Sequence, residues 1–406
     1  MTRSRRIIWS ATFTVVLGAI AACGAQQVKA PLPIAGDQTS KESEIVAVQS
    51  EDSATAGDPS AKTFDILSLV EIGVIDQPVD AASRVGDDGV YFVSRTGTIH
   101  RLDGEMFEID PVLDITDLTE GEGERGLLGL AFSNDGATAY LNYTNRNGDT
   151  TVASLAVDQT GRFDRATLRT LLVINQPFHN HNAGDIVVEP GGTLLIPMGD
   201  GGSFDDLLRR ALDDRSMLGK VLRFDPKNGE VAVLAKGLRN PWRVDLFNDR
   251  LWLADVGQSK FEEISVLEDV STRVGTPFSD ATDIGSSTNS STATSVVDFG
   301  WSAYEADMRF NDDQSSPSHT PPYVAYRHGD NGCSVSGGAV ATSGVLQGRY
   351  IFADYCSGRL WSIATNSSST AMHLHFVELD SPTAIVRAHD EIFVLSLGGN
   401  IWRLNG

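Results

Sequence analysis

Two histidines and an aspartate in one short stretch have the types and spacing for acid–base chemistry. His179 and His181 are two residues apart, so both side chains would leave one face of an extended backbone. An apolar run, a Pro-Gly-Gly turn and a second apolar run then lead to Asp200. This order predicts a strand, a turn and a strand, which would return Asp200 to the neighbourhood of His181. A carboxylate beside an imidazole commonly orients a general base. The alternative is an ordinary turn or core histidine.

The elements that would position these residues are β-strands. From residue 64 onward the sequence consists of short β-rich runs separated by turn signals, with hardly any helical periodicity. Six of these runs share a spacing in which a turn glycine precedes alternating aliphatic residues. They follow or begin at Gly97, Gly148, Gly219, Gly257, Gly358 and Gly399. Repeated four-stranded sheets of this kind predict an all-β fold, a six-bladed β-propeller of four-stranded antiparallel blades. A β-sandwich with irregular loops is the alternative.

Composition limits the classes of partner. The chain has 406 residues, of which 41% are hydrophobic, enough for one large domain or two ordinary ones. The formal net charge is -22. Because phosphate binding requires clustered Lys and Arg, nucleic acid and an anionic membrane surface are excluded as expected partners.

The N-terminus resembles a bacterial lipoprotein signal. Basic residues precede an apolar stretch that ends in Ile-Ala-Ala-Cys at 20–23. We expect a signal peptide over 1–23 with lipid attached to Cys23, a flexible tether over 24–62 and the propeller over 63–406. This predicts a protein of the bacterial cell envelope whose membrane contact is made only through the lipid. A plain signal peptide and a transmembrane anchor are the alternatives.

Two cysteines remain if Cys23 carries lipid. Cys333 and Cys356 would then share an oxidising compartment, where a disulfide between them is the favoured interpretation. A pair of buried thiols is the alternative.

Seven strings in this order resemble a known family. They are GERGLLGLAFSND at 123–135, HNAGDIVVEPGGTLLIPMGDGG at 181–202, LGKVLRFDP at 218–226, GLRNPWRVDLF at 237–247, LWLADVGQSKFEEI at 251–264, DFGWSAYE at 298–305 and GGAVATSGVLQGRYIFADYCSGRLW at 337–361. Together they are similar to the soluble glucose/sorbosone (aldose sugar) dehydrogenases, whose propeller also occurs in hedgehog-interacting-protein-like proteins. The resemblance runs from about residue 64 to residue 404.

The resemblance implies a redox site with a bound cofactor. In enzymes of that family, pyrroloquinoline quinone (PQQ) lies in a cleft on one face of a six-bladed propeller, with Ca2+ beside it. His181 matches the family's base, which removes the proton of the anomeric hydroxyl, and Asp200 matches its carboxylate partner. Arg239 and Asn240 match the pair that contacts the quinone, and a cation at Arg239 would also stabilise charge on the reduced ring.

Further positions follow from the same resemblance. Glu124 matches a polar residue near the sugar. Gly257 and Gln258 match the loop whose carbonyl groups hold calcium, and Glu263 matches a carboxylate associated with a further metal ion. Trp301, an aromatic residue in DFGWSAYE, has the type to stack on a planar ring or a sugar face.

The sequence departs from the glucose-oxidising members at two cofactor anchors. A lysine position of those enzymes falls at Cys356, and the stretch before the last blade offers only Arg387. The expected function is PQQ-dependent oxidation of aldoses to lactones outside the cytoplasm, with a small-molecule sugar substrate and a separate electron acceptor. The alternatives are a non-catalytic propeller that binds a glycan or a protein, and a calcium-dependent hydrolase of the lactonase type.

Overall fold

The described part of the chain is a ring of β-sheets. A computed structural model describes residues 44–46, 67–278, 296–366 and 369–406. These residues contain strands and one short 3-10 helix, Val270–Thr272, and no α-helix, so no helix among them is long and apolar enough to cross a membrane. The expected signal peptide, Cys23, most of the expected tether and much of the Ser/Thr-rich stretch after residue 278 lie outside the described residues.

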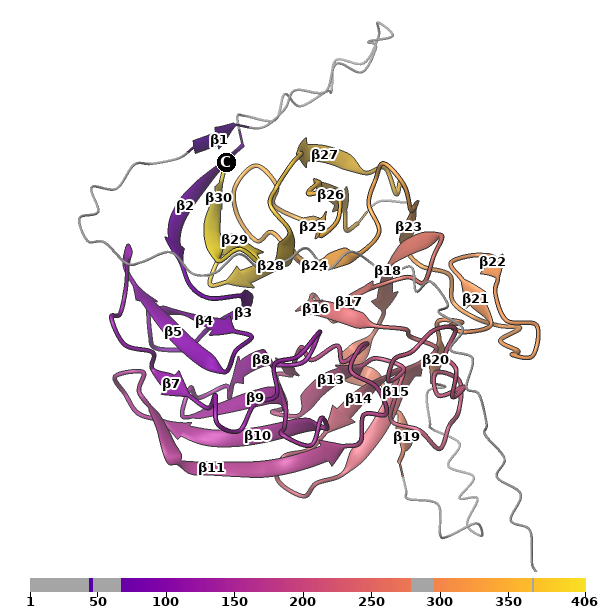
Figure 1. Ribbon diagram of the computed structural model, residues 1–406, viewed down its shortest axis with the longest axis horizontal. Helices are drawn as coiled ribbons and strands as arrows, with labels where there is room; N and C mark the ends of the chain where they lie inside the picture. Colours follow the sequence, from indigo (N-terminus) through magenta and orange to yellow (C-terminus); the bar gives the residue numbers. More distant parts are fainter. Residues whose placement is uncertain (1–43, 47–66, 279–295, 367–368) are drawn as a thin grey trace, which may run out of the picture. The chain divides into compact units, whose positions relative to one another are not determined.

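Six antiparallel sheets surround a central axis, as predicted (Figure 1). Each sheet has four strands in its main path, counting from the axis outward. The blades are β3 (Pro78–Ser83), β4 (Val90–Ser94), β5 (Thr98–Asp103) and β6 (Met106–Phe107); β8 (Leu127–Phe132), β9 (Thr138–Thr144), β10 (Thr150–Val157) and β11 (Phe163–Ile174); β12 (Val187–Val188), β13 (Leu194–Met198), β14 (Lys220–Phe224) and β15 (Val231–Lys236); β16 (Pro241–Phe247), β17 (Arg250–Asp255), β18 (Phe261–Leu267) and β23 (Val324–Arg327); β24 (Val335–Val340), β25 (Arg349–Asp354), β26 (Leu360–Ala364) and β27 (His373–Phe376); and β28 (Pro382–Ala388), β29 (Glu391–Ser396), β30 (Asn400–Asn405) and β2 (Ser68–Val74). The first blade also has a two-residue strand, β7 (Leu113–Asp114), which pairs with β5.

The six similar runs found in the sequence occupy one structural position. They form β5, β10, β14, β18, β26 and β30, and each of these is the third strand of its blade. The predicted blade repeat is therefore confirmed.

The last blade closes the ring. Its outermost strand, β2, comes from the N-terminal side of the described domain and pairs antiparallel with the C-terminal strand β30, with Leu69 opposite Leu404. The short strand β1 (Glu44–Val46), which falls inside the expected tether, pairs in turn with β2. Backbone hydrogen bonds between the two ends of the domain thus hold the ring together.

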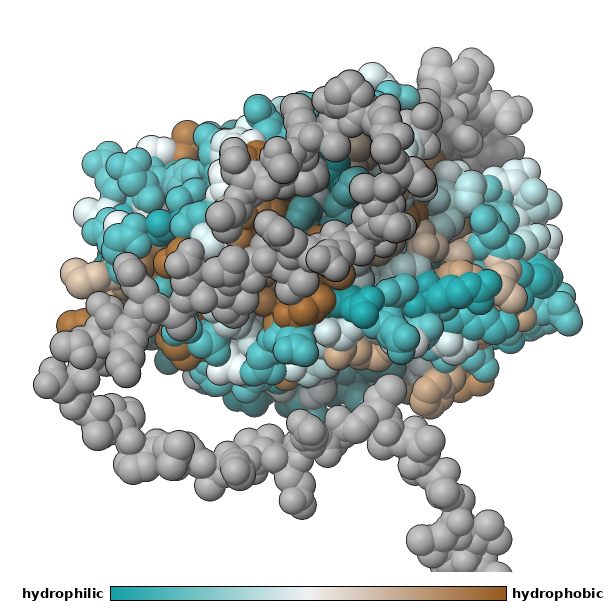
Figure 2. Space-filling view, turned by 90° about the horizontal axis from the view of Figure 1, so that it is seen from above, coloured by the Kyte–Doolittle hydropathy of each residue, from teal (hydrophilic) through white to brown (hydrophobic). Residues whose placement is uncertain are grey.

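Apolar side chains fill the space between neighbouring blades. The core divides into six clusters, one for each pair of adjacent blades. In β13, Leu194 and Ile196 belong to the cluster shared with the preceding blade, whereas Leu195 belongs to the cluster shared with the following blade. Because successive side chains of a strand point to opposite faces, one apolar strand serves two interfaces. In the view of Figure 2 most of the coloured surface is hydrophilic, which agrees with the high content of charged residues.

Carboxylates on the inner strands join adjacent blades near the axis. Asp80 accepts a hydrogen bond from the backbone N–H of Leu130 in the next blade (2.9 Å). Asp245 accepts one from Val340 in the same manner (2.8 Å). These residues lie around a central cavity of about 120 Å3 that also contains the side chain of Arg243. The axis of the ring is therefore polar and cross-linked.

The fourth blade contains a long insertion between β18 and β23. Two of its strands, β19 (Thr276–Pro277) and β20 (Val297–Asp298), pair with β15 of the preceding blade. A hairpin follows, formed by β21 (Tyr304–Glu305) and β22 (Met308–Arg309), which belongs to none of the six blades. The sequence predicted an inserted loop over 270–297, but the insertion continues to this hairpin.

A disulfide joins two loops of the fifth blade. The Sγ atoms of Cys333 and Cys356 are 2.04 Å apart. The buried carboxylate of Asp354 lies between the same loops and accepts backbone N–H groups from both, including those of the two cysteines (3.0 and 2.9 Å). The disulfide and this carboxylate together fix the shape of the fifth blade at one face of the ring.

Loss of the disulfide should lower stability without changing the fold. The two cysteines are 23 residues apart, and a crosslink of that length restricts the unfolded chain by about 3 kcal/mol. We expect Cys333→Ser/Cys356→Ser to unfold at a lower urea concentration, with an unchanged circular dichroism spectrum before the transition. An unchanged urea midpoint would show that the hydrogen bonds of Asp354 suffice to hold these loops.

Candidate active site

The candidate residues are carried by loops at one face of the propeller. In each blade the loop between the second and third strands and the loop leading to the next inner strand end at the same face, because the strands alternate in direction. Asp200 follows β13, Gln258 lies between β17 and β18, and His181 precedes β12. The alternation of strands therefore gathers residues that are distant in the sequence.

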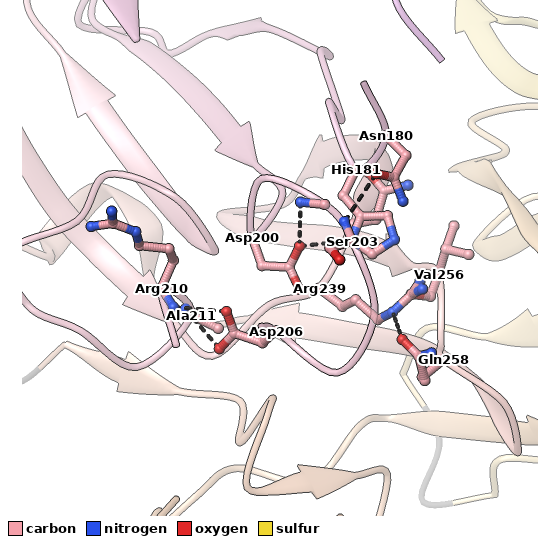
Figure 3. A network of polar contacts seen from close by, with 12 residues as sticks. Asn180, His181, Asp200, Ser203, Asp206, Arg210, Ala211, Arg239, Val256 and Gln258 are labelled. Carbon is pink, nitrogen blue, oxygen red and sulfur yellow. Dashed lines mark hydrogen bonds and ion pairs between the residues drawn. The ribbon is translucent and has the colours of Figure 1, made fainter. Parts of the chain in front are cut away.

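The predicted contact between His181 and Asp200 is present. Nδ1 of His181 lies 2.6 Å from Oδ1 of Asp200, and both side chains are buried (Figure 3). Two further donors fix the carboxylate, since the backbone N–H of Gly202 reaches Oδ1 (2.9 Å) and the indole Nε1 of Trp301 reaches Oδ2 (2.8 Å). Because the carboxylate accepts from Nδ1, the neutral imidazole presents an unprotonated Nε2.

The local conformation around His181 differs from the prediction. His181 has a φ of 57°, so its backbone is left-handed and not extended, and β12 begins only at Val187. The expectation that His179 and His181 would share one face of a strand was wrong, since His179 is exposed and His181 is buried. The carbonyl of His181 packs so closely over Gly199 that a Cβ there would lie 2.0 Å from the carbonyl oxygen. This close approach requires glycine and turns the loop inward.

Glu124 and Asn240 hold the backbone of the histidine loop. The carboxylate of Glu124 accepts the backbone N–H of His181 (2.7 Å) and the side-chain amide of Asn240 (3.1 Å). The amide oxygen of Asn240 in turn accepts the N–H of Ala183 (3.0 Å). These two predicted site residues therefore lie next to His181 and set the position of its backbone.

Arg239 lies beside the same group. Its guanidinium donates to Oε1 of Gln258 through Nε (3.1 Å) and to the carbonyl of Val256 through Nη1 (2.8 Å). The guanidinium carbon lies 5.7 Å from the ring centroid of Trp301. The structure thus brings together Arg239, Trp301 and Asp200 from three separate segments.

Trp301 is placed differently from the expectation. Its side chain is buried, and its ring packs against Phe310 (centroids 4.8 Å apart) as well as under Arg239. Its polar contact with the site is the indole N–H bond to Asp200. It is therefore placed to orient the carboxylate through this bond.

The calcium-loop residues form a tight turn below Arg239. The described residues record no backbone hydrogen bond to the carbonyl oxygens of Gly257 and Gln258. Glu263 accepts the N–H of Ala306 (2.6 Å) through one oxygen. Loss of hydration, together with the negative charge of Asp255, raises the pKa of Glu263 well above its ordinary value. No group of three or more His, Cys, Asp and Glu side chains in the described ranges could hold a metal ion.

Two carboxylates of the site were missed by the sequence analysis. Asp255 accepts the backbone N–H groups of Arg239 (3.0 Å) and Asn240 (2.6 Å), and burial raises its pKa to about 7. Glu305 accepts four backbone N–H groups from the loop that begins at Gln258. Both residues end strings that the resemblance singled out, LWLAD and DFGWSAYE, so those strings contained the signal.

Comparisons with known proteins agree with this geometry. The family model described as Glucose / Sorbosone dehydrogenase matches residues 75–277, which is half of the chain. The chain belongs to this family. Among curated proteins it is 26% identical over 243 residues to the HIPL1 protein of Arabidopsis thaliana, a match that covers 48% of this chain and 31% of that protein. The chain thus spans about a third of the length of that relative.

Solved structures similar to this glucose/sorbosone dehydrogenase family member share its fold. The PQQ-bound form of aldose sugar dehydrogenase from Streptomyces coelicolor is 20% identical with a TM-score of 0.63, and the match covers 84% of this chain and 98% of that one. The apo-form of the soluble aldose sugar dehydrogenase from Escherichia coli is 16% identical with a TM-score of 0.66, covering 84% and 99%. These similarities extend over the whole propeller.

Proposed function

We propose that this protein is a PQQ-dependent sugar dehydrogenase that oxidises the anomeric hydroxyl of aldoses to lactones. The observation that supports this most directly is the 2.6 Å contact between Nδ1 of His181 and Asp200. It leaves Nε2 of His181 without a protein hydrogen bond among the described residues, on the face where Arg239 also lies. Membership of the Glucose / Sorbosone dehydrogenase family supports the reaction class.

The proposed chemistry requires a base that acts while a hydride leaves. His181 accepts the proton of the anomeric hydroxyl at Nε2, which makes departure of the hydride from the same carbon easier. Asp200 keeps the proton of the neutral imidazole on Nδ1 and stabilises the imidazolium that forms. Trp301 and the N–H of Gly202 prevent the carboxylate from turning away. The bound quinone would supply the acceptor for the hydride.

Two arginines fit the acidic cofactor. PQQ carries three carboxylates, so its binding needs cations. Arg239 lies beside the base, and Arg359 lines a separate hollow of about 630 Å3 on the same face, where it is bonded to Asn331 (2.7 Å). Arg243 is buried at the axis, and Arg387 pairs with Asp245 (2.6 Å), so neither is available. Cys356, at the position of a family lysine, is in the disulfide.

Backbone oxygens fit the proposed calcium ion. Ca2+ prefers hard oxygen ligands, and the carbonyls of Gly257 and Gln258 are of that type. The backbone N–H groups of Gln258 and the three residues after it all turn toward Glu305. The loop would therefore hold the ion by its carbonyls, and Glu263 would serve a further metal ion.

Reconstitution tests the proposal. Purified protein should bind PQQ in the presence of Ca2+, seen as a change in the quinone absorbance, and should then reduce an artificial electron-accepting dye when an aldose is added. Chelation of Ca2+ should abolish the dye reduction. Protein that neither binds quinone nor oxidises any aldose would contradict the proposal. Hydrolysis of a lactone without quinone would instead identify a calcium-dependent hydrolase of the lactonase type.

One observation favours a second candidate, a non-catalytic propeller that binds a glycan or a protein. The fifth blade has a disulfide where glucose-oxidising members have a basic anchor, and curated relatives include hedgehog-interacting proteins of mouse and human, 29% identical over 172 residues. A glycan array probed with the quinone-free protein would support this candidate if binding occurred on the face of His181 and reconstitution failed.

We also propose that lipid on Cys23 tethers the protein to the outside of a bacterial membrane. Cys23→Ser should move the protein from the membrane fraction to the soluble fraction of the cell envelope, because no acyl chain can then be attached. Immunoblotting of the two fractions measures the change, and Cys333→Ser/Cys356→Ser is the control that leaves Cys23 intact. Retention of the Cys23→Ser protein in the membrane fraction would argue against lipid attachment.

A further inference from the structure

Glu305 is a buried carboxylate outside the six blades. It ends β21 in the hairpin inserted between β18 and β23, and it is only 1% exposed. No sequence motif gives it a role. A charged group in such a place requires compensating contacts, because burial of an isolated carboxylate is very costly.

Those contacts come from a single loop of the neighbouring blade. Oε1 of Glu305 accepts four consecutive backbone N–H groups, from Gln258 (3.0 Å), Ser259 (2.7 Å), Lys260 (2.8 Å) and Phe261 (3.2 Å). Hydrogen bonds to an ionised acceptor are about twice as strong as neutral ones. One carboxylate oxygen therefore holds the whole turn between β17 and β18.

The shape of this turn is narrowly defined. A Cβ on Gly257 would lie 1.5 Å from the carbonyl oxygen of Phe261, so only glycine fits there. The N–H of Gly257 donates to the buried Glu262 (3.1 Å). The turn is thus held by Glu262 at its beginning and by Glu305 along its length.

The turn in its own turn holds Arg239. Gln258 accepts from Nε of Arg239, and Val256, directly before the turn, accepts from Nη1. Figure 3 shows Gln258 and Val256 on the side of the Arg239 guanidinium that faces away from Asp200. A change in the turn would therefore change the direction of the guanidinium.

We propose that Glu305 is a positioning residue for the site: it fixes the turn at 257–261 so that the guanidinium of Arg239 and the carbonyls of the turn face the bound ligand. The identity of that ligand rests on the proposed function, whereas the positioning of the turn and of Arg239 does not. The second oxygen of Glu305, Oε2, is buried and has no hydrogen-bond partner. Glu305→Gln would therefore keep an acceptor oxygen for the turn while it removes the charge.

Hydrogen exchange and chemical labelling test the positioning without any cofactor. In Glu305→Ala we expect the amides of residues 258–261 to exchange about 10- to 100-fold faster than in the wild type, since bonds to an ionised acceptor are lost. Labelling of Arg239 by phenylglyoxal, followed by mass spectrometry, should accelerate in parallel. Glu305→Gln should be intermediate in both measurements, and as a near-isosteric variant it also covers the case in which Glu305→Ala does not fold.

A matched control separates positioning from general destabilisation. Asp87 is likewise a carboxylate that accepts a backbone N–H, from Gly89 (2.8 Å), but it lies between β3 and β4 at the opposite face. Asp87→Asn should lower the melting temperature and leave exchange at 258–261 and labelling of Arg239 unchanged. Equal effects of Asp87→Asn and Glu305→Ala would overturn the proposal.

Ligand binding supplies a second readout. Titration with PQQ and Ca2+ should show a Kd about 10-fold or more higher in Glu305→Ala, with kcat at saturation nearly unchanged because His181 and Asp200 keep their contact. Wild-type exchange and labelling rates in Glu305→Ala would overturn the role of Glu305. Absence of PQQ binding by the wild type would instead reject the proposed function, and the exchange and labelling rates would still decide the positioning role.

Discussion

His181→Ala should reduce the turnover of aldoses by about 10²- to 10⁴-fold while the propeller remains folded, because a positioned base contributes an effect of that size. Steady-state reduction of an artificial dye by the PQQ- and Ca2+-loaded enzyme measures the loss. The melting temperature and the circular dichroism spectrum establish that the fold is intact. The reduction should appear in kcat, because His181 acts on the proton that leaves in the transition state.

The neighbouring histidine is the matched control. His179 is exposed, and its imidazole makes no hydrogen bond with any of the described residues. His179→Ala should therefore leave kcat and KM almost unchanged. Added imidazole should restore part of the activity of His181→Ala, since the lost group is a base in a small cavity. A larger loss in His179→Ala than in His181→Ala would show that the wrong histidine had been assigned.

Arg243→Met should destabilise the propeller by about 3 to 5 kcal/mol at neutral pH, the cost of leaving buried charges without their partner. Arg243 is 1% exposed at the axis of the ring. Its Nη1 lies 3.4 Å from Asp80 and 3.5 Å from Asp185, and its Nη2 donates to the carbonyl of Leu128 (2.5 Å). Urea unfolding at constant pH measures the difference.

The loss should depend on pH in a defined direction. Burial raises the pKa of both Asp80 and Asp185, and the charge of Arg243 counteracts that increase. Without Arg243 the folded state should bind these protons still more tightly than the unfolded state, so its stability should fall as pH rises. We therefore expect a larger loss at about pH 8 than at about pH 5.

An exposed arginine is the control for this measurement. Arg215 pairs with Asp213 at 3.1 Å, and its side chain is 78% exposed. Exposed ion pairs contribute about 0 to 1 kcal/mol, so Arg215→Met should have little effect at either pH. A similarly small, pH-independent effect in Arg243→Met would mean that water at the axis solvates Asp80 and Asp185 without help from the guanidinium.

The repeated pattern in the sequence was sufficient to predict the fold. Each third strand has a turn glycine followed by alternating aliphatic residues, and this local signal survives the long insertion in the fourth blade. The contact of His181 with Asp200 was also predictable, because the two residues flank the first two strands of one blade. Only the φ of His181 departs from the expected extended chain, and the reason is the close packing of its carbonyl over Gly199.

Other parts of the site were decided by contacts between distant segments. Trp301 donates to Asp200 from 101 residues away, and Glu305 holds a loop of another blade from 44 to 47 residues away. Arg243 belongs to the same string as Arg239 and Asn240, yet its side chain enters the axis and theirs lie at the face of the ring.

The sequence by itself determined the repeated strands, the number of blades and the pairing of a base with its carboxylate, because each depends on residues that are near one another in the chain. The tertiary structure decided which carboxylates hold the loops, which arginines face the ligand and that Cys333 meets Cys356. These depend on how closure of the ring and packing of the inserted hairpin bring separate loops together, and residue spacing within a loop carries no information about that arrangement.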